Sequence, residues 1–391
     1  SRPLVIGISN SNTIGGLPAN LSGGGSGTLP FSIIIDTSKA VGDTFTLPIN
    51  NDAAQDGTID WGDSSTSDLS YANRAHTYSS GGIYTITITG TILKGFNFGV
   101  AGDYLKITEI SQWGILDITS GNNAFKDCAN LTITATDYPK ISATTFYRMF
   151  YNCDLITTPD FSNWDTSTVT NMQEAFRNSL RFNGSLAGWV TSNTTNIRGM
   201  FTSAVAFNQD LSSWDVSGVT TMYEAFKDAD GFNSSVAGWA FKSGVSLYST
   251  FQNAEGFTGI GVDSWDTSNV SSTNRVFNSA DSFNGDISSW DTSNFTDIQY
   301  MLNQCDAFRG SLAGWDITAS MTNMNTFMNG ITGMSTANYD ATLIAWDAQG
   351  SPGYSGTVNF GGSTYTGGGA AAAARASLVT KFGAITDGGI A

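Results

Sequence analysis

Tryptophan recurs along the middle of this chain at a nearly constant interval. Successive residues of the series lie 25, 25, 25, 26, 25 and 25 positions apart, at Trp164, Trp189, Trp214, Trp239, Trp265, Trp290 and Trp315. A fixed period of this length is the signature of structural repeats that stack on one another. The interval therefore predicts a solenoid of about 25-residue coils, each of which buries its apolar side chains against its neighbours.

Two phenylalanine series follow the same period. One runs through Phe182, Phe207, Phe232, Phe257, Phe283 and Phe308, and the other through Phe125, Phe150, Phe176, Phe201, Phe226, Phe251, Phe277 and Phe327, with Leu302 in place of one ring. A single coil of about 25 residues buries too few of these rings to offset its conformational entropy. We therefore expect the rings to stack from coil to coil in one continuous core.

Spacing within the repeat predicts the local structure of each coil. Met222, Ala225 and Phe226 lie at i, i+3 and i+4, which indicates one face of a short helix. The segment 211–214 lies among Asn, Ser and Asp and is expected to be a brief strand or an extended turn. A WD-repeat propeller is the alternative, because Trp-Asp recurs, but its blades need about 40–45 residues each.

Composition limits the possible partners and sites. The 391 residues carry a net charge of −16, which argues against nucleic acid as a partner. Cys128, Cys153 and Cys305 occupy a repeat position that holds alanine in other coils, so we expect small buried side chains rather than metal ligands. A disulfide between Cys128 and Cys153 is possible but not indicated. We expect no cofactor and no metal.

The N-terminal segment 1–28 is rich in Gly, Ser and Asn and has the composition of an arm. We expect it to pack on a neighbour, either another copy or a larger assembly; folding back on its own domain is the alternative. The chain shows no secretory leader at its start and no apolar stretch long enough to span a membrane. Removal of a leader before Ser1 would also account for that start.

Residues 29–92 are expected to form an all-β domain. Strands are predicted at 31–35, 44–49, 57–61 and 83–89, where β-forming residues alternate or cluster between turn signals. The run Asp60-Trp61-Gly62-Asp63, followed by His76-Thr77-Tyr78 and the strand from Gly82, resembles the polycystic-kidney-disease (PKD) domain family. That resemblance implies a small immunoglobulin-like β-sandwich that acts as a spacer or interaction module.

Residues 93–350 are assigned to the solenoid. The segment 124–131 carries an A-F-x-x-C-x-x-L pattern and 149–155 the related M-F-x-x-C-x-L, and both resemble the BspA-like leucine-rich repeats. The later copies resemble the bacterial surface protein repeat of about 26 residues in the same group. The resemblance implies a solenoid used for surface display and binding, without enzymatic activity.

Residues 351–391 are expected to cap the solenoid. A last strand and turn are predicted at 358–362 and a helix at 370–381. The predicted fold class is therefore mainly β with short helices: an N-terminal arm (1–28), a PKD-like sandwich (29–92), a leucine-rich-repeat-type solenoid (93–350) and a strand–helix cap (351–391).

Candidate catalytic residues are scarce. His76 is the one histidine, so a Ser-His-Asp triad would have to use it, and no G-x-S-x-G or phosphate-binding loop is present. Asp60 and Asp63 are candidate calcium ligands, although an Asp in such a turn more often accepts hydrogen bonds from its own backbone. Because most other Asp residues repeat in every coil, we expect them to serve the coil rather than catalysis.

We therefore expect a non-enzymatic structural or binding protein. The favoured hypothesis is a bacteriophage virion protein, a fibre or capsid decoration, anchored to other virion or surface-assembly proteins through residues 1–28. Its solenoid would meet a host-surface glycan or protein, and the protein would be a homo-oligomer or part of a larger assembly on the virion surface. A bacterial cell-surface adhesin is the alternative, and a polysaccharide-degrading enzyme on a solenoid scaffold is a third hypothesis.

Overall fold

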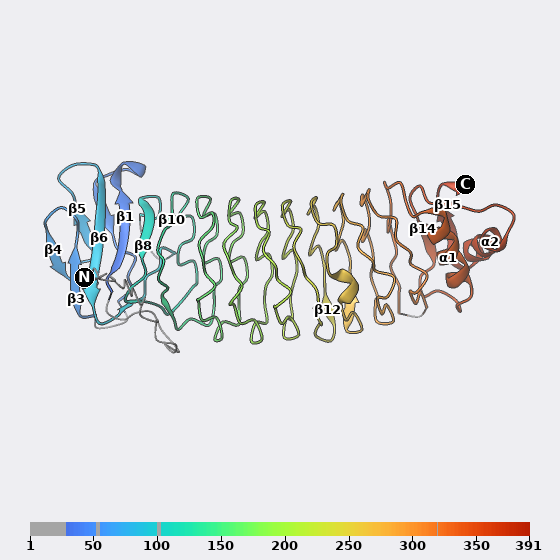
Figure 1. The fold of residues 1–391 in the computed structure, drawn as a ribbon, viewed down its shortest axis with the longest axis horizontal. Coiled ribbons are helices and arrows are strands. Elements are labelled where there is room, and N and C mark those ends of the chain that lie inside the picture. Colours follow the sequence, from blue (N-terminus) through green and yellow to red (C-terminus); the bar gives the residue numbers. More distant parts are fainter. Residues whose placement is uncertain (1–28, 52–54, 100–102, 319) are drawn as a thin grey trace, which may run out of the picture.

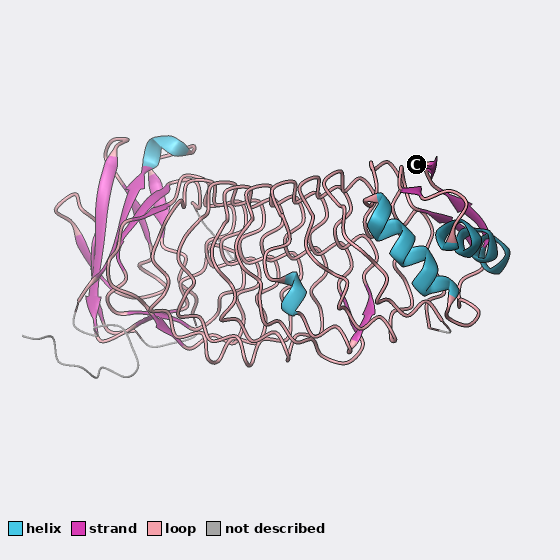
Figure 2. Ribbon diagram, turned by 45° about the vertical axis from the view of Figure 1, so that its right-hand side comes forward, coloured by secondary structure: helices cyan, strands magenta, loops and turns pink. Residues whose placement is uncertain are grey.

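The computed structural model describes residues 29–51, 55–99, 103–318 and 320–391. It is an elongated rod with a β-rich region at one end, a stack of coils in the middle and two α-helices at the other end (Figure 1). Most of the stack is drawn as loop in Figure 2, because the coils consist mainly of turns. The arm predicted at 1–28 lies outside the described residues.

The N-terminal region is built on an antiparallel sheet. It contains β1 (Phe31–Asp36), β2 (Thr44–Thr46), β3 (Gly57–Asp60), β4 (Thr66–Asp68), β5 (Ala75–Thr77) and β6 (Ile83–Gly90). β1 and β3 both pair with β6, β4 pairs with β3, and β2 and β5 form a separate pair. The predicted strands at 31–35, 57–61 and 83–89 are confirmed, and the strand predicted at 44–49 covers β2 and a bridge from Ile49 to Phe96.

The sheet continues without a break into the solenoid. β7 (Leu93–Lys94), β8 (Ile107–Gln112), β9 (Leu116–Ile118), β10 (Thr132–Ile133) and β11 (Lys140–Ile141) form the junction. β8 pairs antiparallel with β1 on one side and parallel with β10 on the other. The N-terminal sheet therefore covers the edge of β8 at that end of the stack.

The solenoid comprises about twelve turns between residues 93 and 390. Parallel bridges join equivalent positions of neighbouring coils, as in Asn171 to Asn196 and Asn196 to Thr221, and they widen into β12 (Val245–Ser246) paired with β13 (Val270–Ser272). A 3-10 helix, Val262–Ser264, lies in the coil that carries the one 26-residue interval between tryptophans.

The short helix predicted around Met222 is wrong, because this part of each coil is a row of turns. The Ala225 amide donates to the Met222 carbonyl three residues back (3.2 Å), whereas the Phe226 amide donates to Thr250 of the next coil (2.8 Å). Alternate amides thus bond within the coil and between coils. An α-helix would direct every amide to a residue four positions back and would leave the next coil without donors.

Left-handed backbone at two positions per coil prevents a helix from forming. The first position is occupied by Asn123, Arg148, Glu174, Gly199, Glu224, Ser249, Arg275, Tyr300 and Thr326, and the second by Asp127, Asn152, Asn178, Ser203, Asp228, Asn253, Ser279, Gln304 and Gly330. Each non-glycine residue there costs roughly 1–2 kcal/mol. The hydrogen bonds between coils offset that cost, so the conformation depends on stacking.

The core is a column of aromatic rings, as the period predicts. Phe176, Phe201, Phe226, Phe251 and Phe277 stack with centroids 5.0–5.9 Å apart and planes within 25° of parallel. All five are at most 1% exposed. The second phenylalanine series stacks beside this column, at 5.7–6.2 Å from coil to coil.

The tryptophans tie neighbouring coils together. All seven are buried, and in five the indole N–H donates to a main-chain carbonyl 28 or 29 residues earlier, at 2.8–3.2 Å: Trp189, Trp239, Trp265, Trp290 and Trp315. The buried indole nitrogens of Trp164 and Trp214 have no such partner in the described chain. Burial and this bond explain why tryptophan is spaced so regularly.

The aspartate that follows tryptophan closes a turn. Asp291 Oδ1 accepts from the amide (3.0 Å) and the hydroxyl (2.6 Å) of Ser293, and Asp215 makes the same pair of bonds with Ser217. These bonds, the serine hydroxyl first, lower the pKa of Asp215 and of Asp291. The buried Thr292 hydroxyl, next in the sequence, donates to the carbonyl of Asp316 in the following coil.

The C-terminal end replaces coils with helices. It contains α1 (Thr336–Asp347), β14 (Gly356–Asn359), β15 (Thr364–Tyr365), α2 (Ala370–Phe382), β16 (Gly383–Thr386) and β17 (Gly389–Ile390). The predicted helix at 370–381 is confirmed as α2, and the strand at 358–362 corresponds to the end of β14 and a turn. α1 was not among the predicted elements; its Trp346 indole donates to the Leu312 carbonyl and so continues the tryptophan series.

Removal of one ring from the middle of the column should be costly. We expect Phe226→Ala to lower the free energy of unfolding by about 3–5 kcal/mol, because the cavity lies between coils that cannot collapse independently. Urea unfolding followed by tryptophan fluorescence measures the loss. The control is Tyr223→Ala, an exposed aromatic of the same coil, for which we expect about 1 kcal/mol or less; an equal loss in both variants would contradict the stacked core.

The aspartate turns should make the coils sensitive to acid. Since the folded pKa values of Asp215 and Asp291 lie below the unfolded values, their stabilisation is complete above the unfolded pKa of about 4 and is lost as the pH falls through the folded pKa. Asp215→Asn/Asp291→Asn keeps a side-chain acceptor but removes the titration. Melting temperatures between pH 2 and 7 at fixed ionic strength should fall less steeply for this variant than for the parent, and parallel profiles would refute the prediction.

Candidate functional site

The candidate catalytic residues of the N-terminal region are engaged in a turn. Asp63 Oδ1 accepts from the Ser65 amide (3.0 Å) and hydroxyl (2.5 Å), and its Oδ2 lies 2.7 Å from His76 Nε2. The bond from Ser65, followed by that from His76, lowers the pKa of Asp63 to about 2. In a catalytic triad the carboxylate and the hydroxyl contact different ring nitrogens. Here both approach Nε2, so this cluster is not arranged as a triad.

His76 also packs as part of a ring cluster. It stacks on the buried Trp61 at 5.0 Å, and Tyr78 meets it edge-on at 4.6 Å. Asp60 Oδ1 accepts from the Gly62 amide at 2.9 Å. Asp60 and Asp63 therefore both accept bonds from their own turn, and in the described ranges no three potential metal ligands of the His, Cys, Asp or Glu type lie together.

The three cysteines are free thiols in the core. Cys128, Cys153 and Cys305 are 0% exposed, as their repeat position predicts. Burial raises the pKa of each thiol. Cys153 and Cys305 lie 3.0 and 2.8 Å from the carbonyls of Phe125 and Phe277, which places each sulfur against the preceding coil. These thiols are therefore neither exposed nor activated as nucleophiles.

One outward-facing surface of the solenoid differs from the rest. We define the Tyr/Arg strip as the side chains at three positions of the turn row, equivalent to residues 223, 224 and 227 of one coil, over the nine coils between residues 122 and 329. Its charged and tyrosine residues are Lys126, Tyr147, Arg148, Tyr151, Glu174, Arg177, Arg198, Tyr223, Glu224, Lys227, Tyr248, Arg275 and Tyr300. These positions vary from coil to coil, whereas the inward positions repeat, so the strip is free to encode recognition.

The strip is a positive surface on a negative protein. Six of the ten Lys and Arg residues between 121 and 330 lie on it, but only two of the twenty Asp and Glu residues. Five of the six tyrosines in that span also lie on it. Tyrosine and arginine are the residue types most enriched where binding energy concentrates.

Side-chain contacts run along the strip from coil to coil. Arg148 pairs with Glu174, whose carboxylate also lies 3.8 Å from Arg177. Arg177 reaches Glu224 at 3.9 Å, and Glu224 lies 3.7 Å from Lys227. These ion pairs show that the three positions face one common surface, and they hold the cations in a fixed row.

The C-terminal half of the strip is aromatic. Tyr223 and Tyr248 meet edge-on at 5.6 Å, and Arg275 lies over the rings of Tyr248 (5.8 Å) and Tyr300 (4.6 Å). Arg275 Nη1 also donates to the Tyr248 hydroxyl at 3.1 Å. The guanidinium and the rings are thus ordered before any ligand arrives, which lowers the entropic cost of binding.

A hollow of about 380 Å³ lies at the N-terminal end of the strip. Lys126 and Arg148 line it together with Tyr104, Asn123 and Asp127. Asn123 Oδ1 is buried there without a hydrogen-bond partner in the described chain. Lys126 is paired with Asp127 at 2.6 Å and Arg148 with Glu174, so the recess suits a polar group with hydroxyls rather than a free anion.

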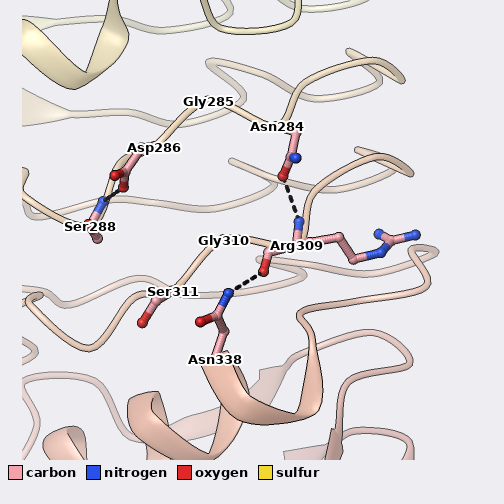
Figure 3. Close-up of a pocket in the computed structure, with 8 residues that line it drawn as sticks. All are labelled: Asn284, Gly285, Asp286, Ser288, Arg309, Gly310, Ser311 and Asn338. Carbon is pink, nitrogen blue, oxygen red and sulfur yellow. Dashed lines mark hydrogen bonds between the residues drawn. The ribbon is translucent and has the colours of Figure 1, made fainter.

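A second polar hollow, of about 370 Å³, lies where the last coils meet α1 (Figure 3). Its walls carry Asn284, Asp286, Arg309 and Asn338. Asn284 Oδ1 accepts from the Arg309 amide, and Asn338 donates to the Arg309 carbonyl at 2.8 Å. Asp286 Oδ1 accepts from the Ser288 amide. Because these side chains are already hydrogen-bonded to the protein's own main chain, this hollow is the weaker candidate for a binding site.

The Tyr/Arg strip was not among the sites predicted from the sequence, for which no binding residues were named. The signal was present: arginine and tyrosine gather at three repeat positions while aspartate dominates elsewhere. None of the helices in the described part of the chain has the length and apolar character needed to cross a bilayer.

Comparison with known proteins adds a family. A comparison with curated proteins finds no match, and neither does one with solved structures. The family described as "Mycoplasma protein of unknown function, DUF285" matches residues 144–261 and 245–346, which together are slightly more than half of the 391 residues. This match and the coil architecture agree with the BspA-like resemblance, whereas the PKD-like resemblance of residues 29–92 has no match and stays a prediction. The chain belongs to the DUF285 family of repeat solenoids.

Proposed function

We propose that the protein is a non-enzymatic binding protein displayed on a surface, and that the Tyr/Arg strip is the part that meets the target. The observation that carries this proposal is the separation of positions in the coil: repeated residues hold the stack, while the variable cations and tyrosines gather on one outer row. A rigid scaffold with a variable outer row is how repeat proteins bind extended targets.

The state of the carboxylates favours binding over hydrolysis. A glycosidase needs two carboxyl groups on either side of a bond, and the aspartates that follow tryptophan instead accept bonds from their own turns. His76 is held by Asp63 and Trp61. A polysaccharide-degrading enzyme therefore has less support than a binding protein, and a single Asp substitution that abolished glycan turnover would reverse this order.

For the location we propose a virion surface, as a fibre or capsid decoration, with a bacterial cell surface as the alternative. In this proposal residues 1–28 anchor the chain to other assembly proteins, the PKD-like region spaces it, and the rod carries the strip outward. The elongated shape supports both locations, because a rod places its outer row away from its attachment point (Figure 1). The encoding gene should lie among capsid or tail genes if the virion location is correct.

Removal of residues 1–28 tests the anchor. We expect the shortened protein to melt at the temperature of the full chain but to be absent from purified virions, as measured by mass spectrometry of the particles. A matched control keeps the arm and carries Phe226→Ala, which weakens the core without touching the anchor. Incorporation of the shortened protein at the normal level would contradict the anchoring role, and a leader sequence upstream of Ser1 would favour the cell surface.

A further inference from the structure

The main chain of the strip is not available to a ligand. The Glu174 and Glu224 amides donate to carbonyls of the next coil at 2.9 and 3.1 Å, and the Lys227 amide donates to Glu224 within its coil at 3.2 Å. Most amides at the first strip position are not free for a ligand either, because they donate to side chains two residues back, as in Gln173 and Gln299. A peptide therefore cannot add as a strand here, and recognition has to come from side chains.

Those side chains combine two kinds of contact. Tyr223 is 39% exposed and offers an apolar ring with a polar hydroxyl. Arginine offers a planar fork that binds a carboxylate through two parallel hydrogen bonds. A sugar acid presents a matching group for each contact: the apolar C–H face of its ring packs on tyrosine, and its carboxylate pairs with arginine.

A cation without an internal partner lies in the middle of the row. Arg148, Arg177 and Lys227 each lie within ion-pair distance of a glutamate. The Arg198 side chain is exposed, and in the described chain no carboxylate lies within ion-pair distance of it. Arg198 belongs to the coil between the ion pairs around Glu174 and the rings that begin at Tyr223. It is therefore positioned to pair with a negative group from outside.

The strip fits a linear polymer of moderate charge. Its positions recur at the coil spacing, which the ring column sets at 5.0–5.9 Å. The two acidic residues on the strip offset part of its positive charge, and the whole protein carries −16. A nucleic acid, with roughly one charge per 1.7 Å of duplex, would meet strong repulsion from the rest of the rod.

We infer that the Tyr/Arg strip binds an acidic polysaccharide, a linear glycan of uronic acid residues, with the sugar faces on Tyr223 and Tyr248 and the carboxylates on Arg198 and Arg275. This inference rests on the proposed function and names the class of its target. The hollow beside Lys126 and Arg148 receives one end of the glycan.

Binding of the full chain to immobilised polymers tests the inference. The probes are alginate, polygalacturonate and hyaluronan, with dextran as a neutral glycan, poly-glutamate as an acidic peptide and oligo-dT as a nucleic acid. We expect at least one uronate polymer to bind, in a salt-sensitive way, and the other three probes not to bind. Two double variants remove the contacts in turn: Arg198→Ala/Arg275→Ala and Tyr223→Ala/Tyr248→Ala. Each should raise the dissociation constant for that polymer by on the order of tenfold or more.

The control variant is Arg181→Ala/Lys242→Ala, which removes two exposed cations that lie off the strip. It should bind like the parent, and all variants should keep the parent melting temperature to within a few degrees. The inference is overturned if no uronate polymer binds, if poly-glutamate or oligo-dT binds as tightly, or if the control loses as much affinity as the strip variants. If excess purified protein still blocks attachment of virions or cells while no uronate polymer binds, the proposed function survives and only the glycan class is wrong.

Discussion

The structure depends on the contact between one coil and the next. In the described middle of the rod, coils consist mainly of turns, with one 3-10 helix at Val262–Ser264 and short strands that pair only with another coil. These turns are held by amides that donate to the following coil, such as Phe226 to Thr250. Those bonds require a constant distance between coils, and the stacked phenylalanine rings supply it. Stability is therefore a property of neighbouring coils rather than of any one coil.

This arrangement separates the residues that fold the chain from those that are free to recognise a target. Tryptophan, phenylalanine and the turn-forming aspartate recur because each makes the same contact in every coil. The outer row makes contacts that differ between coils, from the ion pairs around Glu174 to the stacked Arg275. Substitutions on that row change charge and shape while the ring column stays intact.

The two ends of the stack need covering structures, because the outermost coils have a neighbouring coil on one side only. An open coil exposes unpaired amides and carbonyls, which invite association with another chain. At the N-terminal end β8 pairs with a strand of the sheet on one side and with the first coil on the other. At the C-terminal end α1 and α2 pack together, and Trp346 of α1 takes the place of a coil tryptophan.

The sequence by itself determined the period, the buried ring series, four strands of residues 29–92 and the helix at 370–381, because each depends on local pattern. It did not indicate β4 and β5, which are only three residues long. It also contained the signal for α1: Ser335 as N-cap and apolar residues Tyr339, Leu343 and Trp346 at helical spacing. Only the tertiary structure decided that the row around Met222 is a series of turns, since its left-handed residues are stabilised by bonds to another coil. The strip likewise depends on the tertiary structure, because its side chains come from positions about 25 residues apart and meet only when the coils stack.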